Sequence, residues 1–140
     1  MYANNGVPGY EYNFLGLERT TIAATVPLPP GKATIKLDFA YDGGGAGKGG
    51  TGTLFVNGTK VAEGQIKRTQ RAIFPADETA DVGIYLDIPA VEAIGAEAKS
   101  RFNGQIPKVT IDAKVPEKKA AFDAGETARV EALLRKTLAD

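Results

Sequence analysis

The side chains best suited to binding a ligand are aromatic and basic, and they fall in short, separate stretches of the chain. Aromatic rings offer a stacking surface for sugars, and clustered cations bind sulfate or phosphate groups through charge-assisted hydrogen bonds. The candidates for these roles are Tyr10, Tyr12, Lys48, Lys67, Arg68, Arg71 and Tyr85. Each also has a structural interpretation, because an aromatic row on a strand usually faces the core and charged side chains commonly keep a strand edge solvated.

Three carboxylates, those of Asp77, Glu78 and Asp81, lie close together in the sequence within a predicted loop. A hard cation such as calcium takes six or more oxygen ligands, and these residues lack the spacing of an EF-hand. They are the candidates for a metal site, although the pattern favours an acidic loop. We therefore expect neither a resident metal nor another cofactor.

Several residue types on which enzymes depend are missing from the sequence. The chain has no Cys, no His and no Trp, and Ser100 is its single serine. Thiolate nucleophiles, histidine bases and Cys/His zinc sites are therefore excluded within this chain. Paired carboxylates catalyse some reactions without His, but no spacing here singles out such a pair. We expect the chain not to be an enzyme.

The overall charge and hydropathy give no sign of nucleic acid or membrane as a partner. Seventeen basic residues balance seventeen acidic ones, so no net field attracts the chain to polyanions or to an anionic lipid surface. No apolar run approaches the roughly 20 residues of a membrane span. The first residues lack the basic start and apolar segment of a signal peptide, and the compartment stays open.

Alternating patterns in the first half of the chain predict the strands that must position these residues. Apolar and polar residues alternate at 10–14 and most cleanly at 34–41, and residues 19–26 are rich in Thr, Ile and Val. The dipeptide Asn57-Gly58 suits a type I′ turn, which needs positive φ at both positions. The register that this turn predicts places Val56 opposite Thr59, Phe55 opposite Lys60 and Leu54 opposite Val61.

The glycine-rich stretch 42–50 lies between two of these strands. Residues 45–50 spell G-x-G-x-x-G, but a dinucleotide site requires a helix after the loop and here a strand follows. The stretch therefore predicts a long, permissive connection. Lys48 at its tip is the one candidate for binding an anion.

The second half of the sequence gives mixed signals. Residues 91–99 are rich in Ala and favour a short helix that Gly95 interrupts. Residues 102–106 and 108–112 have the pattern of strands, with Val109 and Ile111 facing the core.

The last part of the chain changes in character after Val115. Residues 126–138 place Val130, Leu133, Leu134 and Leu138 on one helical face. We predict a mainly β domain over 1–115, an antiparallel β-sandwich or part of one, and a helical tail over 116–140.

Several consecutive blocks of the sequence resemble a known family. They are similar, in order and in spacing, to the C-terminal region of a large group of bacterial arylsulfatases, and the similarity covers most of residues 10–112. The blocks are Tyr10-Glu11-Tyr12-Asn13-Phe14-Leu15-Gly16-Leu17-Glu18-Arg19, Tyr41-Asp42-Gly43-Gly44-Gly45, Gly47-Lys48-Gly49-Gly50-Thr51, Val56-Asn57-Gly58, Val61-Ala62-Glu63-Gly64, Asp77-Glu78-Thr79 and Asp81-Val82-Gly83.

The resemblance implies a domain without catalysis. In that family a formylglycine made from the Cys or Ser of a C/S-x-P-x-R motif works with His, Lys and acidic metal ligands of another domain. None of these residues carries over, because Ser100 is followed by Arg101-Phe102 and the chain has no His. The family's C-terminal region resembles a concanavalin-like or laminin-G-like β-sandwich, related to the jelly roll. The implied role is a structural or interaction module, and a carbohydrate-binding module, including one for sulfated glycans, is the alternative.

Two departures from the family pattern bear on partners. Residues 84–100 replace a Gly/Thr/Pro-rich loop of the family, and the family's sandwich has strands before the first one that matches here. A sheet that lacks part of its sandwich leaves open edges. We therefore expect a homodimer, and the other partners that the resemblance implies are a sulfatase catalytic domain or a glycan.

Overall fold

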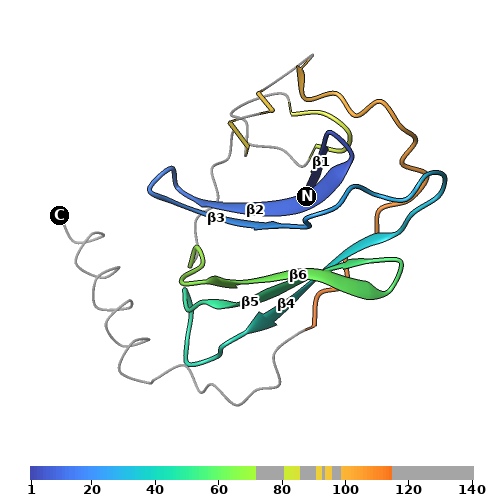
Figure 1. Ribbon diagram of the computed structural model, residues 1–140. Helices are drawn as coiled ribbons and strands as arrows, with labels where there is room; N and C mark the ends of the chain where they lie inside the picture. The colour runs from blue at the N-terminus through green and yellow to red at the C-terminus, as the bar shows by residue number, and fades with distance from the viewer. Residues whose placement is uncertain (72–80, 86–90, 93, 96–98, 115–140) are drawn as a thin grey trace.

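Two antiparallel sheets of three strands each form the regular structure of the described residues (Figure 1). The structure is a computed structural model that describes residues 1–71, 81–85, 91–92, 94–95 and 99–114. The strand order is β1-β2-β3 in the first sheet and β4-β5-β6 in the second, so neighbours in sequence are neighbours in each sheet. The described part of the chain is therefore mainly β, as the sequence predicts.

The first sheet consists of β1 (Tyr2–Asn4), β2 (Val7–Phe14) and β3 (Glu18–Ala23). Asn5 and Gly6 join β1 to β2 with φ values of 50° and 77°, as a two-residue type I′ turn requires. The strands predicted at 10–14 and 19–26 are both present. The first of them begins earlier than expected and the second ends earlier.

The second sheet consists of β4 (Ile35–Tyr41), β5 (Gly50–Val56) and β6 (Thr59–Ile66). The predicted turn between β5 and β6 is confirmed, because Asn57 and Gly58 have φ values of 49° and 84°. The side chain of Asn57 also accepts a hydrogen bond from the Thr34 backbone N–H at 2.8 Å. This bond ties the start of β4 to the turn.

A β-bulge corrects one part of the predicted register. Val56 pairs with Thr59 and Phe55 with Lys60, as expected, but Leu54 pairs with Ala62 instead of Val61. Without the shift, Glu63 would lie on the same face as buried Leu54, because one residue of slip turns every following side chain over. The bulge therefore keeps the charge of Glu63 outside.

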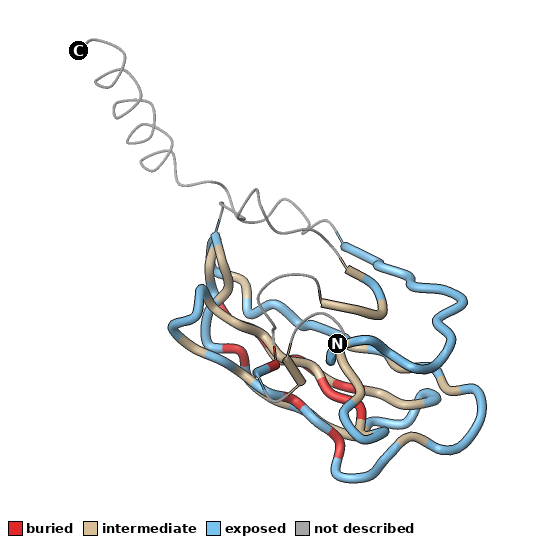
Figure 2. The backbone as a smooth tube through the Cα atoms, turned by 90° about the horizontal axis from the view of Figure 1, so that it is seen from above, coloured by how far each residue is buried: buried red, intermediate tan, exposed pale blue. Residues whose placement is uncertain are grey.

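The closest approach of the two sheets is made by one isoleucine and two glycines. Ile22 of β3 is buried over β5 and β6, where a Cβ on Gly52 would lie 2.5 Å from its Cδ1 and a Cβ on Gly64 2.8 Å from its Cγ1. Leu54 and Ile66 are buried on the same face of the second sheet. Figure 2 shows that few of the described residues are buried. The core therefore depends on this short contact.

The predicted strands at 102–106 and 108–112 are wrong. Residues 101–114 contain no strand, and every one of them is exposed (Figure 2). Ile111, predicted to face the core, is 88% exposed. A strand needs a neighbour that pairs with it along its length. Among the described residues the Gly83 carbonyl accepts a hydrogen bond from the Phe102 backbone N–H at 2.7 Å, but no ladder of such bonds forms beside the segment.

The predicted helices have different outcomes. Within 91–99 the described residues form a turn, in which the Val91 carbonyl accepts hydrogen bonds from the N–H groups of Ile94 and Gly95 at 3.0 and 3.3 Å. No α-helix occurs there among the residues that the structure describes. The helix predicted over 126–138 lies outside the described residues.

The contact between Ile22 and Gly52 gives a test of the core. We expect Gly52→Ala to lower the free energy of unfolding by about 1–3 kcal/mol through overpacking. Ile22→Val removes the Cδ1 atom that the new methyl group meets, and by itself costs about 0.5–1.5 kcal/mol. The double variant should therefore lose less than the sum of the single changes, by at least about 0.5 kcal/mol, in urea unfolding.

Gly64→Ala is the matched control. A Cβ at Gly64 would lie 2.8 Å from Ile22 Cγ1, which valine retains, and 3.3 Å from Cδ1, so Ile22→Val should relieve this variant less than it relieves Gly52→Ala. Both substitutions carry the same gain from removing glycine from a strand. Additive losses in both double variants would contradict the described packing.

Candidate functional site

The two candidate tyrosines of β2 lie between the sheets. Tyr10 pairs with Ile22 and Tyr12 with Thr20, and paired residues of an antiparallel ladder share a face. The Tyr12 hydroxyl accepts a hydrogen bond from the Gln70 backbone N–H at 2.8 Å. Burial, followed by the neighbouring Tyr12, raises the pKa of Tyr10 above its usual value. Tyr12 therefore holds the segment after β6 against the first sheet.

The candidate cations Lys67 and Arg68 are engaged within the chain. Lys67 Nζ and Arg68 Nε each lie 3.3 Å from a different carboxylate oxygen of Glu18. The guanidinium of Arg68 also lies 4.4 Å from the centre of the Phe14 ring, within the range of a cation–π contact. Both cations therefore fasten the chain after β6 to the turn between β2 and β3.

The glycine loop is organised around one hydroxyl group. The Tyr41 hydroxyl donates to the Gly45 carbonyl and accepts from the Lys48 backbone N–H at 3.0 Å. Thr69 Oγ1 donates to the Lys48 carbonyl at 2.8 Å. Positive φ at Gly43, Gly44, Gly45 and Gly47 shows why the loop is rich in glycine, since other residues rarely adopt that conformation.

The remaining two candidate cations both lie on this loop. Lys48 is part of it, and Arg71 crosses it so closely that a Cβ on Gly47 would lie 2.4 Å from Arg71 Cγ. Within the described part of the chain, neither the Lys48 ammonium nor the Arg71 guanidinium forms an ion pair. Of the four candidate cations, these two are the ones that no described carboxylate engages.

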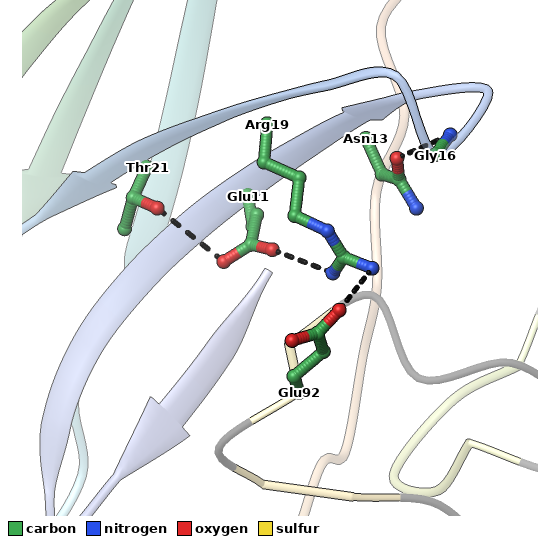
Figure 3. A network of polar contacts seen from close by, with 6 residues as sticks. All are labelled: Glu11, Asn13, Gly16, Arg19, Thr21 and Glu92. Atoms are coloured by element: carbon green, nitrogen blue, oxygen red, sulfur yellow. Dashed lines mark hydrogen bonds and ion pairs between the residues drawn. The ribbon is translucent and has the colours of Figure 1, made fainter.

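A carboxylate that the sequence did not indicate lies at the centre of a polar network on the outer face of the first sheet (Figure 3). The side chain of Glu11 is only 9% exposed. One of its oxygens accepts from Arg19 at 3.2 Å and the other from Thr21 at 3.4 Å. Arg19 also contacts a carboxylate oxygen of Glu92 at 2.9 Å. Glu11 is thus enclosed and paired.

The negative charge of Glu11 affects the pKa of two tyrosines, Tyr2 and Tyr85. Burial, followed by that charge, raises the pKa of both Tyr2 and Tyr85 above the usual value. The backbone of Tyr85 is held by Ser100, whose Oγ accepts from Tyr85 N at 2.8 Å and donates to Tyr85 O at 3.2 Å. The single serine therefore anchors residue 85 near the outer face of the first sheet. The hairpin register alone would have placed Thr21 opposite Glu11, but no local pattern indicates that Tyr85 and Glu92 lie near Glu11.

The acidic candidates give no site that the structure describes. Asp77 and Glu78 lie outside the described residues, and Asp81 is within them. In the described ranges, no three Cys, His, Asp or Glu side chains gather as metal ligands do. Nor does any helix there have the length and apolar character to cross a membrane.

The described part of the chain is mainly β. Most of the candidate polar side chains described above form hydrogen bonds or ion pairs within the chain. No family model matches the chain, and neither a curated protein nor a solved structure shows significant similarity to it. The relation to the arylsulfatase C-terminal region stays a prediction from the sequence blocks.

Removing the charge of Glu11 gives a test of the outer network. We expect Glu11→Gln to lower the pKa of Tyr2 and Tyr85 while leaving Tyr10 unchanged, since the raised pKa of Tyr10 has other causes. Tyrosine ring signals followed by NMR through the alkaline range would measure this. Equal movement of all three tyrosines would contradict the arrangement.

The same shifts set the direction of a pH effect on stability. A raised pKa in the folded state means that the unfolded chain loses the tyrosine proton first. Stability should therefore fall as the pH rises above the unfolded value of about 10. In Glu11→Gln the fall contributed by Tyr2 and Tyr85 should be shallower in urea unfolding measured at several alkaline pH values.

Proposed function

We propose that this chain is a non-catalytic structural and interaction module related to the C-terminal region of bacterial arylsulfatases. The proposal rests on one observation: the buried polar side-chain atoms of the described residues are hydrogen-bonded within the chain, whereas some large apolar side chains are exposed. No buried side-chain N or O atom in the described residues lacks a hydrogen-bond partner, whereas Phe39 and Tyr41 of β4 are 41% and 42% exposed. Unused surface that is apolar suits contact with another protein.

The missing residue types support the same proposal. A sulfatase of this family needs its formylglycine precursor and its histidines, and the chain has no Cys, no His and no C/S-x-P-x-R motif. The enclosed carboxylate of Glu11 is paired with Arg19, so it serves the sheet. The two facing sheets fit the beginning of a concanavalin-like or laminin-G-like sandwich, whose further strands would come from outside residues 1–71.

An activity assay tests the absence of catalysis. The purified chain, incubated with an aryl sulfate and calcium, should release no phenol above the rate of the buffer. Turnover that the native chain keeps after repurification and that the Glu11→Gln variant lacks would contradict the proposal. Turnover that is equal in both proteins and disappears on repurification identifies a contaminant.

A carbohydrate-binding role is the second candidate, and it is favoured by two cations at the glycine loop that form no ion pair with the described residues. Lys48 of the loop and Arg71, which lies against Gly47, offer charge-assisted hydrogen bonds to a sulfate group. The loop itself is fixed by Tyr41 and Thr69. The tyrosine row of β2 contributes less to this role, because it lies between the sheets.

Calorimetric titration with a sulfated oligosaccharide tests the second candidate. If the loop binds sulfate, Lys48→Ala and Arg71→Ala should each weaken binding by about tenfold, and salt should weaken it further. Lys32→Ala, which removes an exposed lysine elsewhere, is the matched control. Absence of binding, or equal weakening by all three substitutions, would argue against the glycan role.

A further inference from the structure

The outer edge of β4 is the longest uninterrupted strand edge in the described part of the chain, and its own charged residues, Lys36 and Asp38, are of opposite sign. Short edges, bulges and charged flanks are the features that keep sheets from pairing edge to edge. At the other edges, β1 has three residues, β6 carries the bulge, and β3 is flanked by the ion pairs of Glu18 and Arg19. β4 pairs with β5 over seven residues without interruption and has no described strand on its other side.

The face of β4 that points toward the first sheet is also incompletely covered. The first sheet approaches the second where Ile22 packs against β5 and β6. On the inner face of β4, Ile35 and Leu37 are half-buried, and the end of the strand is exposed. Phe39 and Tyr41, whose ring centres are 6.3 Å apart, remain substantially exposed there. The open hydrogen-bonding edge and the exposed apolar row thus occur on the same strand.

We propose that a second copy of this chain covers this edge, by antiparallel pairing of β4 with β4 about a two-fold axis at Leu37. The inference rests on the proposed function, because it names the partner of the interaction module. It commits to one register, which the charges of the strand select.

Charge complementarity is the reason for this register. Lys36 and Asp38 lie on the outer face of β4, where Lys36 Nζ and Asp38 Oδ2 are 2.8 Å apart. With the axis at Leu37, Lys36 of each copy lies opposite Asp38 of the other. Two lysines and two aspartates then alternate around the axis. On the inner face, Ile35 lies opposite Phe39 and Leu37 opposite itself.

The neighbouring registers are worse for physical reasons. A shift by one residue brings the polar face of one copy beside the apolar face of the other. An axis at Asp38 places two aspartates directly opposite, and an axis at Lys36 places two lysines opposite, and like charges in cross-strand positions are destabilising. The axis at Leu37 avoids both problems.

Charge reversal tests the register directly. We expect the full chain to be a dimer by light scattering at about 100 µM, a concentration chosen because association depends on it. Lys36→Asp and Asp38→Lys should each raise the dimer dissociation constant at least about tenfold, since two attractive pairs become repulsive. An equimolar mixture of these two variants should form a heterodimer, and K36D/D38K should restore the homodimer.

The matched control is Glu63→Lys, which breaks the exposed Lys60–Glu63 ion pair at 2.8 Å away from β4. It should leave the dimer intact. Circular dichroism of each variant shows whether the fold is kept. A monomeric native chain, a dimer that ignores Asp38→Lys, or a mixture that stays monomeric would each overturn the proposal.

A cross-link gives a second measurement in a chain that has no Cys. Opposite Cα atoms in antiparallel strands are about 4.5–5.5 Å apart, within the disulfide range of about 4.4–6.8 Å. Leu37→Cys should therefore form a disulfide dimer on oxidation. Phe39→Cys should not, because its two copies would lie about 14 Å apart along the strands. Cross-linking of both variants to the same extent would indicate random collision and refute the axis at Leu37.

The outcome is separable from that of the proposed function. A dimer with aryl sulfatase turnover would leave the β4 interface standing and remove the non-catalytic role. A monomer without turnover would do the reverse, and a sulfatase catalytic domain would become the occupant to test on the same edge.

Discussion

The fold depends on how closely its two sheets approach at Ile22. A side chain at either Gly52 or Gly64 would occupy space that Ile22 fills, so the absence of two Cβ atoms sets the distance between β3 and the second sheet. Leu54 and Ile66 become buried as a result of the same approach. Because interiors pack densely, a side chain added at either glycine would force the two sheets apart or displace Ile22. The β-bulge belongs to the same constraint, since it brings Gly64 instead of Glu63 onto the inner face.

Polar side chains then connect the segments that the core cannot hold. Glu18 attracts Lys67 and Arg68, and Tyr12 accepts from Gln70, so the chain after β6 is bound to the first sheet at several points. Such exposed ion pairs contribute at most about 1 kcal/mol each. Their main effect is to set the direction in which the chain leaves β6. Glu11 acts similarly on the outer face, where it joins β2 and β3 through Arg19 and Thr21.

The sequence predicts local geometry better than long-range arrangement. The alternation at 34–41 and the Asn57-Gly58 turn depend on neighbouring residues only, and the structure contains both. The bulge could have been found by noting that the simple register turns Glu63 inward. The network around Glu11 could not, because its outer part comes from Glu92 and Tyr85, far along the chain. The failure at 108–112 has the opposite origin. Its alternating pattern is clear, but a strand also needs a neighbour, and the local sequence does not state whether one is present.

The exposed apolar residues at 108–112 and on β4 bear in the same way on the free energy of folding, because apolar surface left in water contributes no hydrophobic stabilisation. The buried apolar side chains in the described part of the chain are Ile22, Ala24, Leu54, Ile66 and Val91. In folded proteins the margin between hydrophobic gain and conformational entropy is narrow. A partner that binds the folded form and not the unfolded form widens this margin by mass action. If a second copy occupies the edge of β4, as we propose, association and folding are linked equilibria, and the stability gained grows with the logarithm of the partner's concentration.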